Sequence, residues 1–126
     1  MKKILVTRRL LRSNEERILK LWTANLNLND DIYSSKKLID LSKDCDAILS
    51  SIVDKIDENV INKLSDKVKI ISNFAVGFGN IDINSARKRN IMVTNTPDVL
   101  TDATAEIAML LIIGAARRAA EGIKKV

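Results

Sequence analysis

The sequence predicts an α/β fold in which a flavodoxin-like, doubly wound parallel sheet is followed by one long apolar helix. Short apolar, β-rich runs alternate with segments of helical periodicity through about residue 96. The connections between them are short, and neighbouring parallel strands need a crossover such as these helices provide. A last segment with apolar residues all round its helical surface predicts the long helix.

Each element is assigned from its own pattern of residues. Apolar or alternating runs predict strands over residues 3–7, 25–29, 46–50, 68–72 and 91–94. Apolar residues at helical spacing predict helices over residues 14–22, 34–41, 57–64 and 83–89, and the long helix over 102–120. The side chains expected to cap helices are Ser13 or Asn14, Asp57, and Thr101 or Asp102.

The long helix is expected to be buried by something other than the rest of this chain. Between residues 105 and 116 only Glu106 is charged, so no face of the helix is suited to water. A run of this length is too short to cross a bilayer, which takes about 20 residues. We therefore expect this helix at a domain or subunit contact and predict no membrane association.

Composition narrows the class of protein. The first residues lack the apolar core of a signal peptide, and the single cysteine, Cys45, lies between two aspartates and is expected to be inert, so a cytoplasmic location is expected. The formal charge is +5, but the basic residues are scattered and aromatic residues make up only 3% of the chain. That pattern argues against a nucleic-acid partner and suits attraction of a small anionic substrate.

A glycine-containing loop is the first candidate site. The segment NFAVGFGNID, residues 73–82, follows an apolar strand, and doubly wound sheets place ligands at the carboxyl ends of strands. Gly77 and Gly79 are expected to adopt positive φ and to let the N–H groups of Val76 and Gly77 hold a substrate carboxylate. The alternative is that these glycines only shape a turn. Asp82 stands where a dinucleotide loop would need its third glycine, which excludes a Rossmann motif here.

A second candidate segment is IMVTNTPDVLTDATAE, residues 91–106. Threonine hydroxyls and free N–H groups at the start of a helix suit a phosphate or another polar ligand. Capping of the helix by Thr101 or Asp102 explains the same residues equally well.

Residues 72–122 closely resemble the D-isomer-specific 2-hydroxyacid dehydrogenase family, and within it the glyoxylate/hydroxypyruvate reductase branch. Both loop segments and the helix after them occur in the family's order, whereas residues 1–64 match only in pattern. Two departures are Gly79, where the family often has aspartate, and Asn90, where it commonly has glycine. Asparagine tolerates left-handed geometry, so the turn at Asn90 is expected to persist.

The resemblance implies roles for individual residues. The main chain of Val76 and Gly77 would hold the substrate carboxylate, Ser51 and Ile52 would form the facing wall, and Leu100 would line the cleft. Thr104 would touch the cofactor, NAD or NADP. Residues 1–98 would be the first segment of the substrate-binding domain, and residues 99–126 the interdomain helix that begins the nucleotide-binding domain.

The resemblance also implies an activity that these residues do not complete. Family members reduce small 2-oxo acids to D-2-hydroxy acids by hydride transfer, as homodimers, with a catalytic arginine, glutamate and histidine. This sequence has no histidine and no G-x-G-x-x-G, so both the catalytic groups and the dinucleotide domain are expected beyond residue 126. No catalytic role is assigned to Arg87, Arg89 or Arg117.

Two other functions stay open. A stand-alone flavodoxin-like module that binds a small carboxylate or a protein partner fits the missing catalytic groups equally well. A basic nucleic-acid binder is the remaining alternative, which salt-dependent binding to random DNA would reveal.

Overall fold

Strands and helices alternate along the chain from residue 3 to residue 94, as the sequence predicts. The computed structural model describes residues 1–125. Its strands are β1 (Lys3–Val6), β2 (Thr23–Asn25), β3 (Ala47–Ser51), β4 (Ile70–Phe74) and β5 (Met92–Thr94). Its helices are α1 (Arg12–Leu21), α2 (Ser35–Ser42), α3 (Glu58–Lys63), α4 (Ile83–Lys88), α5 (Thr101–Ala116) and α6 (Ala119–Ile123).

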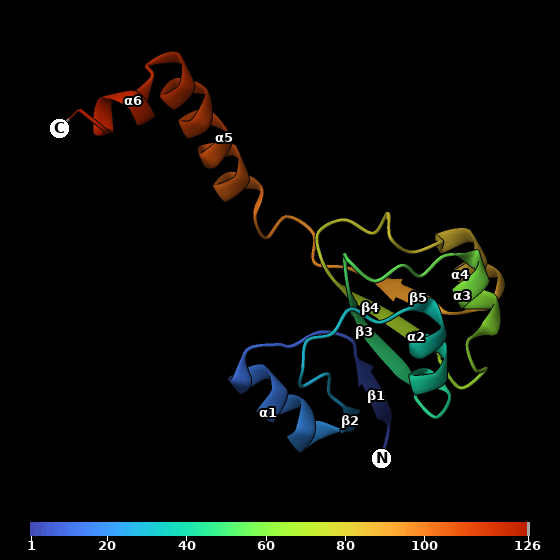
Figure 1. Cartoon of the computed structure of the whole chain (residues 1–126). Coiled ribbons are helices and arrows are strands. Elements are labelled where there is room, and N and C mark those ends of the chain that lie inside the picture. The colour runs from blue at the N-terminus through green and yellow to red at the C-terminus, as the bar shows by residue number, and fades with distance from the viewer. Residues whose placement is uncertain (126) are drawn as a thin grey trace.

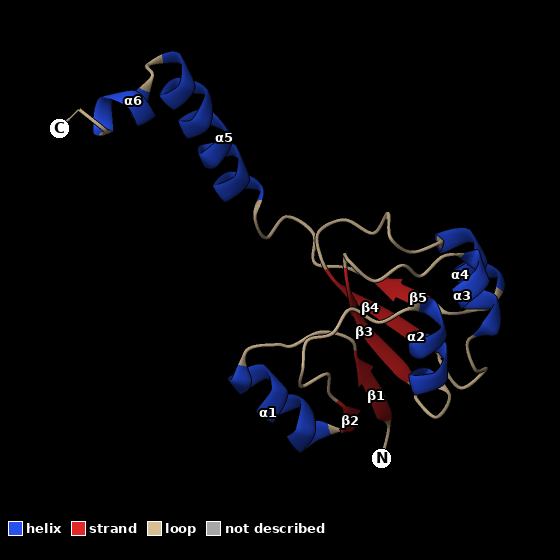
Figure 2. Ribbon diagram, in the orientation of Figure 1, coloured by secondary structure: helices blue, strands red, loops and turns tan. Residues whose placement is uncertain are grey.

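The strands form one parallel sheet in the order β2-β1-β3-β4-β5 (Figure 1). Helices α2, α3 and α4 lie on one side of it and α1 on the other (Figure 2). This is the doubly wound, flavodoxin-like arrangement that the alternation of elements predicts, and the prediction is confirmed.

The hydrophobic core lies between the sheet and helices α2 to α4. Leu5, Ile48 and Ile71 are neighbours in the register of β1, β3 and β4, and each is at most 1% exposed. Val60 and Ile61 of α3 cover them and are fully buried. Burying each such side chain stabilises the fold by about 1.5–3 kcal/mol, so this layer holds the strand ends in place.

The opposite face of the sheet is only partly covered. Ile4, Ala47 and Ile70 are half-buried, whereas Met92 and Phe74 are 63% and 61% exposed. Helix α1 packs beside β2 at one end and leaves the β4–β5 end open. Parallel sheets are ordinarily covered on both faces, so this face is available for contact with further protein.

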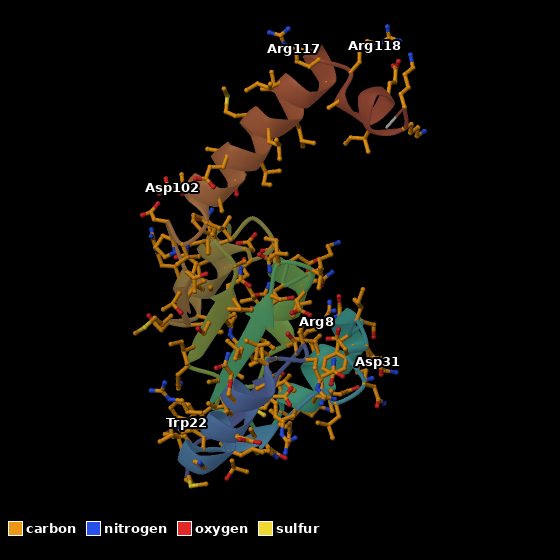
Figure 3. All side chains as sticks on the ribbon, turned by 90° about the vertical axis from the view of Figure 1, so that its left-hand side faces the viewer. Arg8, Trp22, Asp31, Asp102, Arg117 and Arg118 are labelled. Carbon is orange, nitrogen blue, oxygen red and sulfur yellow. The ribbon has the colours of Figure 1, made fainter. Side chains whose placement is uncertain are left out.

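Helix α5 extends away from the sheet (Figure 1). All its residues except Gly114 are exposed, and its side chains project outward on all sides between Asp102 and Arg117 (Figure 3). The expected cover at a domain or subunit contact therefore stays a prediction. None of the described helices is long and apolar enough to cross a membrane.

Three local predictions are wrong. The second strand covers Thr23–Asn25 rather than residues 25–29, because the Asn27 side chain is buried in a turn. Its Nδ2 donates to the carbonyl oxygens of Thr7, at 2.7 Å, and Asp31, at 2.8 Å. The long helix ends at Ala116 because Arg118 is left-handed, with φ of 53°, and separates it from α6.

The third error concerns helix caps. Helices α1 and α5 begin after Leu11 and Leu100, without a side-chain cap, so the expected caps at residues 13–14 and 101–102 are wrong. The Asp57 cap of α3 is confirmed, with its carboxylate accepting from the N–H of Val60 at 3.1 Å. The left-handed turn at Asn90 is also confirmed, with φ of 54°.

Candidate functional site

The loop after β4, residues 75–80, lies at the carboxyl edge of the sheet, where doubly wound folds place ligands. The ends of β3 and β5 flank it because these strands are the neighbours of β4. Val76 is half-buried, and Gly77 and Phe78 are exposed. The loop therefore presents its main chain to the outside while its flanks are fixed by the sheet.

Three successive carbonyl groups of this loop accept hydrogen bonds from neighbouring segments. The Ala75 oxygen accepts from the Thr96 N–H at 2.9 Å, and the Val76 oxygen from Asn95 Nδ2 at 2.7 Å. The Gly77 oxygen accepts from Asn73 Nδ2 at 2.9 Å. Every carbonyl from Ala75 to Gly77 is thus held by a hydrogen bond.

The N–H groups that follow these carbonyls are left open. In a planar trans peptide the C=O of one residue and the N–H of the next point in opposite directions. A hydrogen bond that holds the carbonyl therefore turns the N–H of the next residue away from the donor of that bond. Within residues 1–125 the N–H groups of Val76, Gly77 and Phe78 donate no hydrogen bond. An unpaired main-chain donor is a strong binding group for an anion, particularly a carboxylate.

Contrary to the expectation from the sequence, the open N–H groups do not depend on left-handed glycines. No described glycine has a positive φ, so the left-handed turn predicted at Gly77 and Gly79 is wrong. The carbonyl tethers set the direction of the peptides instead. A Cβ placed on Gly77 would lie 3.8 Å from Ile52 Cδ1, an ordinary contact, and one on Gly79 would meet nothing within 4 Å. Gly77 and Ile52 therefore face each other, and the fold itself would accept alanine at either glycine.

A buried polar network fixes the underside of the loop. Asn73 is 1% exposed, and its Oδ1 accepts from the Ser50 hydroxyl at 3.0 Å. Asn80 Nδ2 donates to the carbonyl oxygens of Ser51 and Asp54, both at 3.0 Å. These bonds join the loops after β3 and β4 into one rigid edge.

The end of β3 is organised around Asp54, which is 1% exposed. Its Oδ2 accepts from the Thr7 hydroxyl at 2.5 Å and from the Ser51 N–H at 2.8 Å. Asp54 Oδ1 and Ser51 Oγ are buried, and neither has a partner within residues 1–125. The Ser51 hydroxyl is therefore turned into the protein, while the next residue, Ile52, is 52% exposed and faces the loop after β4.

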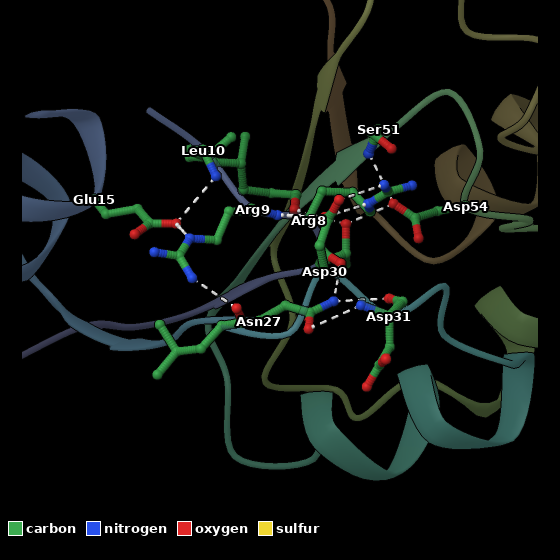
Figure 4. A network of polar contacts seen from close by, with 12 residues as sticks. Arg8, Arg9, Leu10, Glu15, Asn27, Asp30, Asp31, Ser51 and Asp54 are labelled. Carbon is green, nitrogen blue, oxygen red and sulfur yellow. Dashed lines mark hydrogen bonds and ion pairs between the residues drawn. The ribbon is translucent and has the colours of Figure 1, made fainter. Parts of the chain in front are cut away.

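An ion pair lies beside this group at the end of β1 (Figure 4). The Arg8 guanidinium donates two hydrogen bonds to the Asp30 carboxylate, each at 2.8 Å, and the Arg9 N–H donates a third at 2.8 Å. The hydrogen bonds from Arg8, followed by that from Arg9, hold the pKa of Asp30 well below its usual range. Arg8 is therefore committed to Asp30 rather than free for a ligand.

Leu100 and Thr104 lie apart from this edge. Leu100 precedes α5 and is 50% exposed, and the Thr104 N–H donates to the Leu100 carbonyl within the first helical turn. The structure brings Val76, Gly77 and Ile52 together, whereas Thr104 lies in α5, which projects from the sheet (Figure 1), and Leu100 immediately precedes that helix.

Other reactive groups are used structurally. Cys45 is fully buried, and burial is the main cause that raises the pKa of its thiol, in keeping with the inert role expected for it. Arg89 donates to the carbonyl oxygens of Ile61 and Leu64 and pairs with Asp66. The described residues contain no cluster of three or more histidine, cysteine or acidic residues that could hold a metal ion.

Sequence reasoning missed Asn73 and Asn95. Each is an asparagine at the end of an apolar strand, and these strands are neighbours in the sheet. That pattern could have indicated side-chain amides at the same edge. Their carbonyl partners could not be read from the pattern, because they are set by the path of the loop.

These features define the chain as a doubly wound α/β domain with unpaired main-chain donors at the carboxyl edge of its sheet. The model of the family "D-isomer specific 2-hydroxyacid dehydrogenase, catalytic domain" matches residues 4–124. The chain belongs to this family.

Individual relatives agree with that assignment. A glyoxylate reductase of Korarchaeum cryptofilum is 40% identical over 119 residues, which are 94% of this chain and 36% of that protein. A glycerate dehydrogenase of Hyphomicrobium methylovorum is 37% identical over 125 residues, 99% of this chain and 39% of that protein. The crystal structure of a glyoxylate reductase from Paecilomyes thermophila superposes with a TM-score of 0.79 at 26% identity, covering 94% of this chain and 39% of that one. The chain thus spans little more than a third of the length of these relatives.

Proposed function

We propose that this chain is the N-terminal part of an NAD(P)-dependent oxidoreductase that reduces small 2-oxo acids, of the glyoxylate or hydroxypyruvate type, to D-2-hydroxy acids. Residues 1–98 would form the first segment of the substrate-binding domain, and residues 99–126 the helix that begins the nucleotide-binding domain. The observation that carries the proposal is the pair of unbonded N–H groups at Val76 and Gly77, which face away from their tethered carbonyls. Membership of the family and the names of the relatives above support the substrate class.

In this proposal the loop after β4 binds the carboxylate that every 2-oxo acid carries. Each N–H···O⁻ bond would contribute about 1.5–3 kcal/mol, and two adjacent donors would also fix the rotation of the acid. Ile52 would limit the space beside Gly77 and favour a short carbon chain. Ser51 would contribute only to the shape of the facing wall, because its hydroxyl is buried and its N–H already donates to Asp54 Oδ2.

The cofactor would be held mainly by protein outside this chain. The sequence has no G-x-G-x-x-G, and Thr104 is a single exposed side chain on a projecting helix, so residues 1–125 do not fit a dinucleotide. Thr104 and Leu100 would reach the cleft only when the second domain positions α5. The catalytic groups are likewise assigned to none of the residues of this chain.

The whole protein is proposed to be a homodimer. Helix α5 exposes six large apolar side chains between Ile107 and Ile113, each 55–66% accessible. An exposed apolar surface of this kind marks an interaction site. Contact with the second domain and with a second subunit would cover it on different sides.

The carboxylate site is tested by titrating the ¹⁵N-labelled protein with glyoxylate and following the amide signals by two-dimensional NMR. We expect the amide signals of Val76, Gly77 and Phe78 to shift most, and acetamide, a neutral ligand of similar size, to shift none of them. Saturable glyoxylate shifts confined to other segments would refute the site. Glyoxylate-dependent oxidation of NADH or NADPH by a chain that also carries the dinucleotide-binding domain tests the reaction.

A stand-alone carboxylate-binding module remains the second candidate. It is favoured by the hydrophobic core, all of whose buried members precede α5. A monomer that unfolds cooperatively and does not associate through α5 would support this alternative. A stable dimer joined through α5 would favour the dehydrogenase.

A further inference from the structure

Asn95 joins the two loops that form the candidate site. It follows β5, and its Nδ2 reaches across to the carbonyl oxygen of Val76 at 2.7 Å. The next residue, Thr96, donates its N–H to the Ala75 oxygen at 2.9 Å. Two consecutive residues of one loop thus hold two consecutive carbonyl groups of the other.

We propose that Asn95 is a positioning residue, which acts through the Val76 carbonyl to aim the Gly77 N–H at the substrate carboxylate. The inference rests on the function proposed above. The Val76 carbonyl and the Gly77 N–H belong to one rigid peptide group, so rotation of one is rotation of the other. The tether therefore determines where the Gly77 donor points, although Asn95 itself touches no ligand.

The chemistry of this position calls for a neutral donor. A carbonyl oxygen can be held only by a hydrogen-bond donor, and the amide side chain provides one without adding charge. Aspartate has the same shape but at neutral pH can only accept, so it would repel the Val76 oxygen. Leucine has a similar size and offers neither a donor nor a charge.

Within residues 1–125 the loop has no second tether at the same peptide. Asn73 holds the next carbonyl, that of Gly77, from the side of β4, and Thr96 holds the preceding one. Loss of the Asn95 bond would free the peptide between these two anchors while leaving both anchors in place. The effect should therefore be local and should leave the fold intact.

The decisive variants are Asn95→Asp and Asn95→Leu, with Thr94→Val as the matched control. Thr94 is the preceding residue, and its hydroxyl donates to Ser72 Oγ at 3.1 Å, away from the loop. The first readout is the orientation of the Gly77 N–H vector, from residual dipolar couplings without ligand. The second is the Kd for glyoxylate from the NMR titration.

We expect both Asn95 variants to keep the chemical shifts of the core, to reorient the Gly77 N–H, and to weaken glyoxylate binding at least tenfold. Thr94→Val should change neither readout. An unchanged Gly77 vector and Kd in Asn95→Leu would overturn the inference, while glyoxylate binding by the unaltered protein would leave the proposed function standing. If the unaltered protein bound no glyoxylate but the vector still moved in both variants, the carboxylate site would fail and the positioning of the peptide by Asn95 would hold.

Discussion

The side-chain nitrogen of Asn95 lies 2.7 Å from the carbonyl oxygen of Val76, so the loop after β5 directly contacts the loop after β4. The two residues are 19 positions apart in the sequence. They come together because β4 and β5 are parallel neighbours whose carboxyl ends share one edge. The contact turns the Gly77 N–H, which belongs to the same peptide group, away from Asn95.

Gly77→Ala should impair ligand binding without unfolding the protein. The added methyl would meet only Ile52, at an ordinary 3.8 Å, but it would fill the space between Ile52 and the Gly77 main chain, where the ligand is proposed to bind. We expect the Kd for glyoxylate to rise about 10- to 100-fold, the equivalent of one lost charge-assisted hydrogen bond. Gly79→Ala is the control, because its methyl would meet nothing within 4 Å. Equal affinities of the two variants, measured by NMR titration, would argue against a ligand beside Gly77.

Asp57→Ala should destabilise the domain by about 1 kcal/mol, since it removes the side-chain cap of α3. Helix α3 packs Val60 and Ile61 into the core, so fraying at its start affects global unfolding. Asp102→Ala is the matched comparison, because Asp102 caps no helix and α5 lies outside the core. Urea denaturation should separate the two variants, and similar midpoints for both would contradict the assigned cap.

Asn90→Gly should preserve the stability of the domain, whereas Asn90→Ala should lower it by about 1–2 kcal/mol. Asn90 is left-handed, with φ of 54°, and a Cβ-bearing residue other than asparagine or aspartate pays that cost in this conformation. Thermal unfolding followed by circular dichroism would measure the difference. If Asn90→Ala were more stable than Asn90→Gly, the turn would not be left-handed in solution.

The Arg8–Asp30 pair should make stability sensitive to acid. The pKa of Asp30 is lowered in the folded protein, chiefly by its hydrogen bonds from Arg8, so folding favours the ionised form. The stabilisation is present above the ordinary aspartate pKa of about 4 and is lost as the pH falls through the lowered folded value. Asp30→Asn keeps a residue that tolerates the left-handed φ of 57° and removes the titrating group.

We expect Asp30→Asn to be less stable than the unaltered protein at pH 6, and the difference to shrink at pH 2.5. Urea unfolding at both values measures it. Asp44→Asn is the control, since Asp44 forms no ion pair within the described residues. A difference that stayed constant between the two pH values would refute the linkage.

Helix α5 should drive self-association of the 126-residue protein. Leu110 and Leu111 are 64% and 66% exposed on it, and their burial in a contact would be favourable. The double change Leu110→Gln and Leu111→Gln should shift the protein toward monomer in sedimentation velocity. Leu28→Gln provides the comparison, because Leu28 is 61% exposed in the turn between β2 and α2 and is not part of α5. A monomer at all concentrations before any substitution would contradict the prediction.

Periodicity alone was enough to predict the order of strands and helices. The apolar run that contains Ile71 and the helical spacing of Val60, Ile61 and Leu64 are local signals, and these four residues are buried in the structure. The Asp57 cap was predictable for the same reason, because it depends on residues within four positions. The Asn90 turn was expected from the family resemblance and from the tolerance of asparagine for left-handed geometry. The composition of α5 was also sufficient to predict a helix whose apolar surface would be buried by other protein.

The contacts that shape the candidate site are not local, and the sequence did not reveal them. The second strand ends at Asn25 rather than at residue 29, and Asn27 instead bonds the Thr7 carbonyl across 20 positions. The open N–H groups were expected from left-handed glycines, yet they depend on the carbonyl tethers of Asn73, Asn95 and Thr96. A pattern of residue types records which groups can donate. Which donor meets which carbonyl is settled only when the sheet brings its strand ends together, because hydrogen bonds act over about 3 Å and require both groups to be in place.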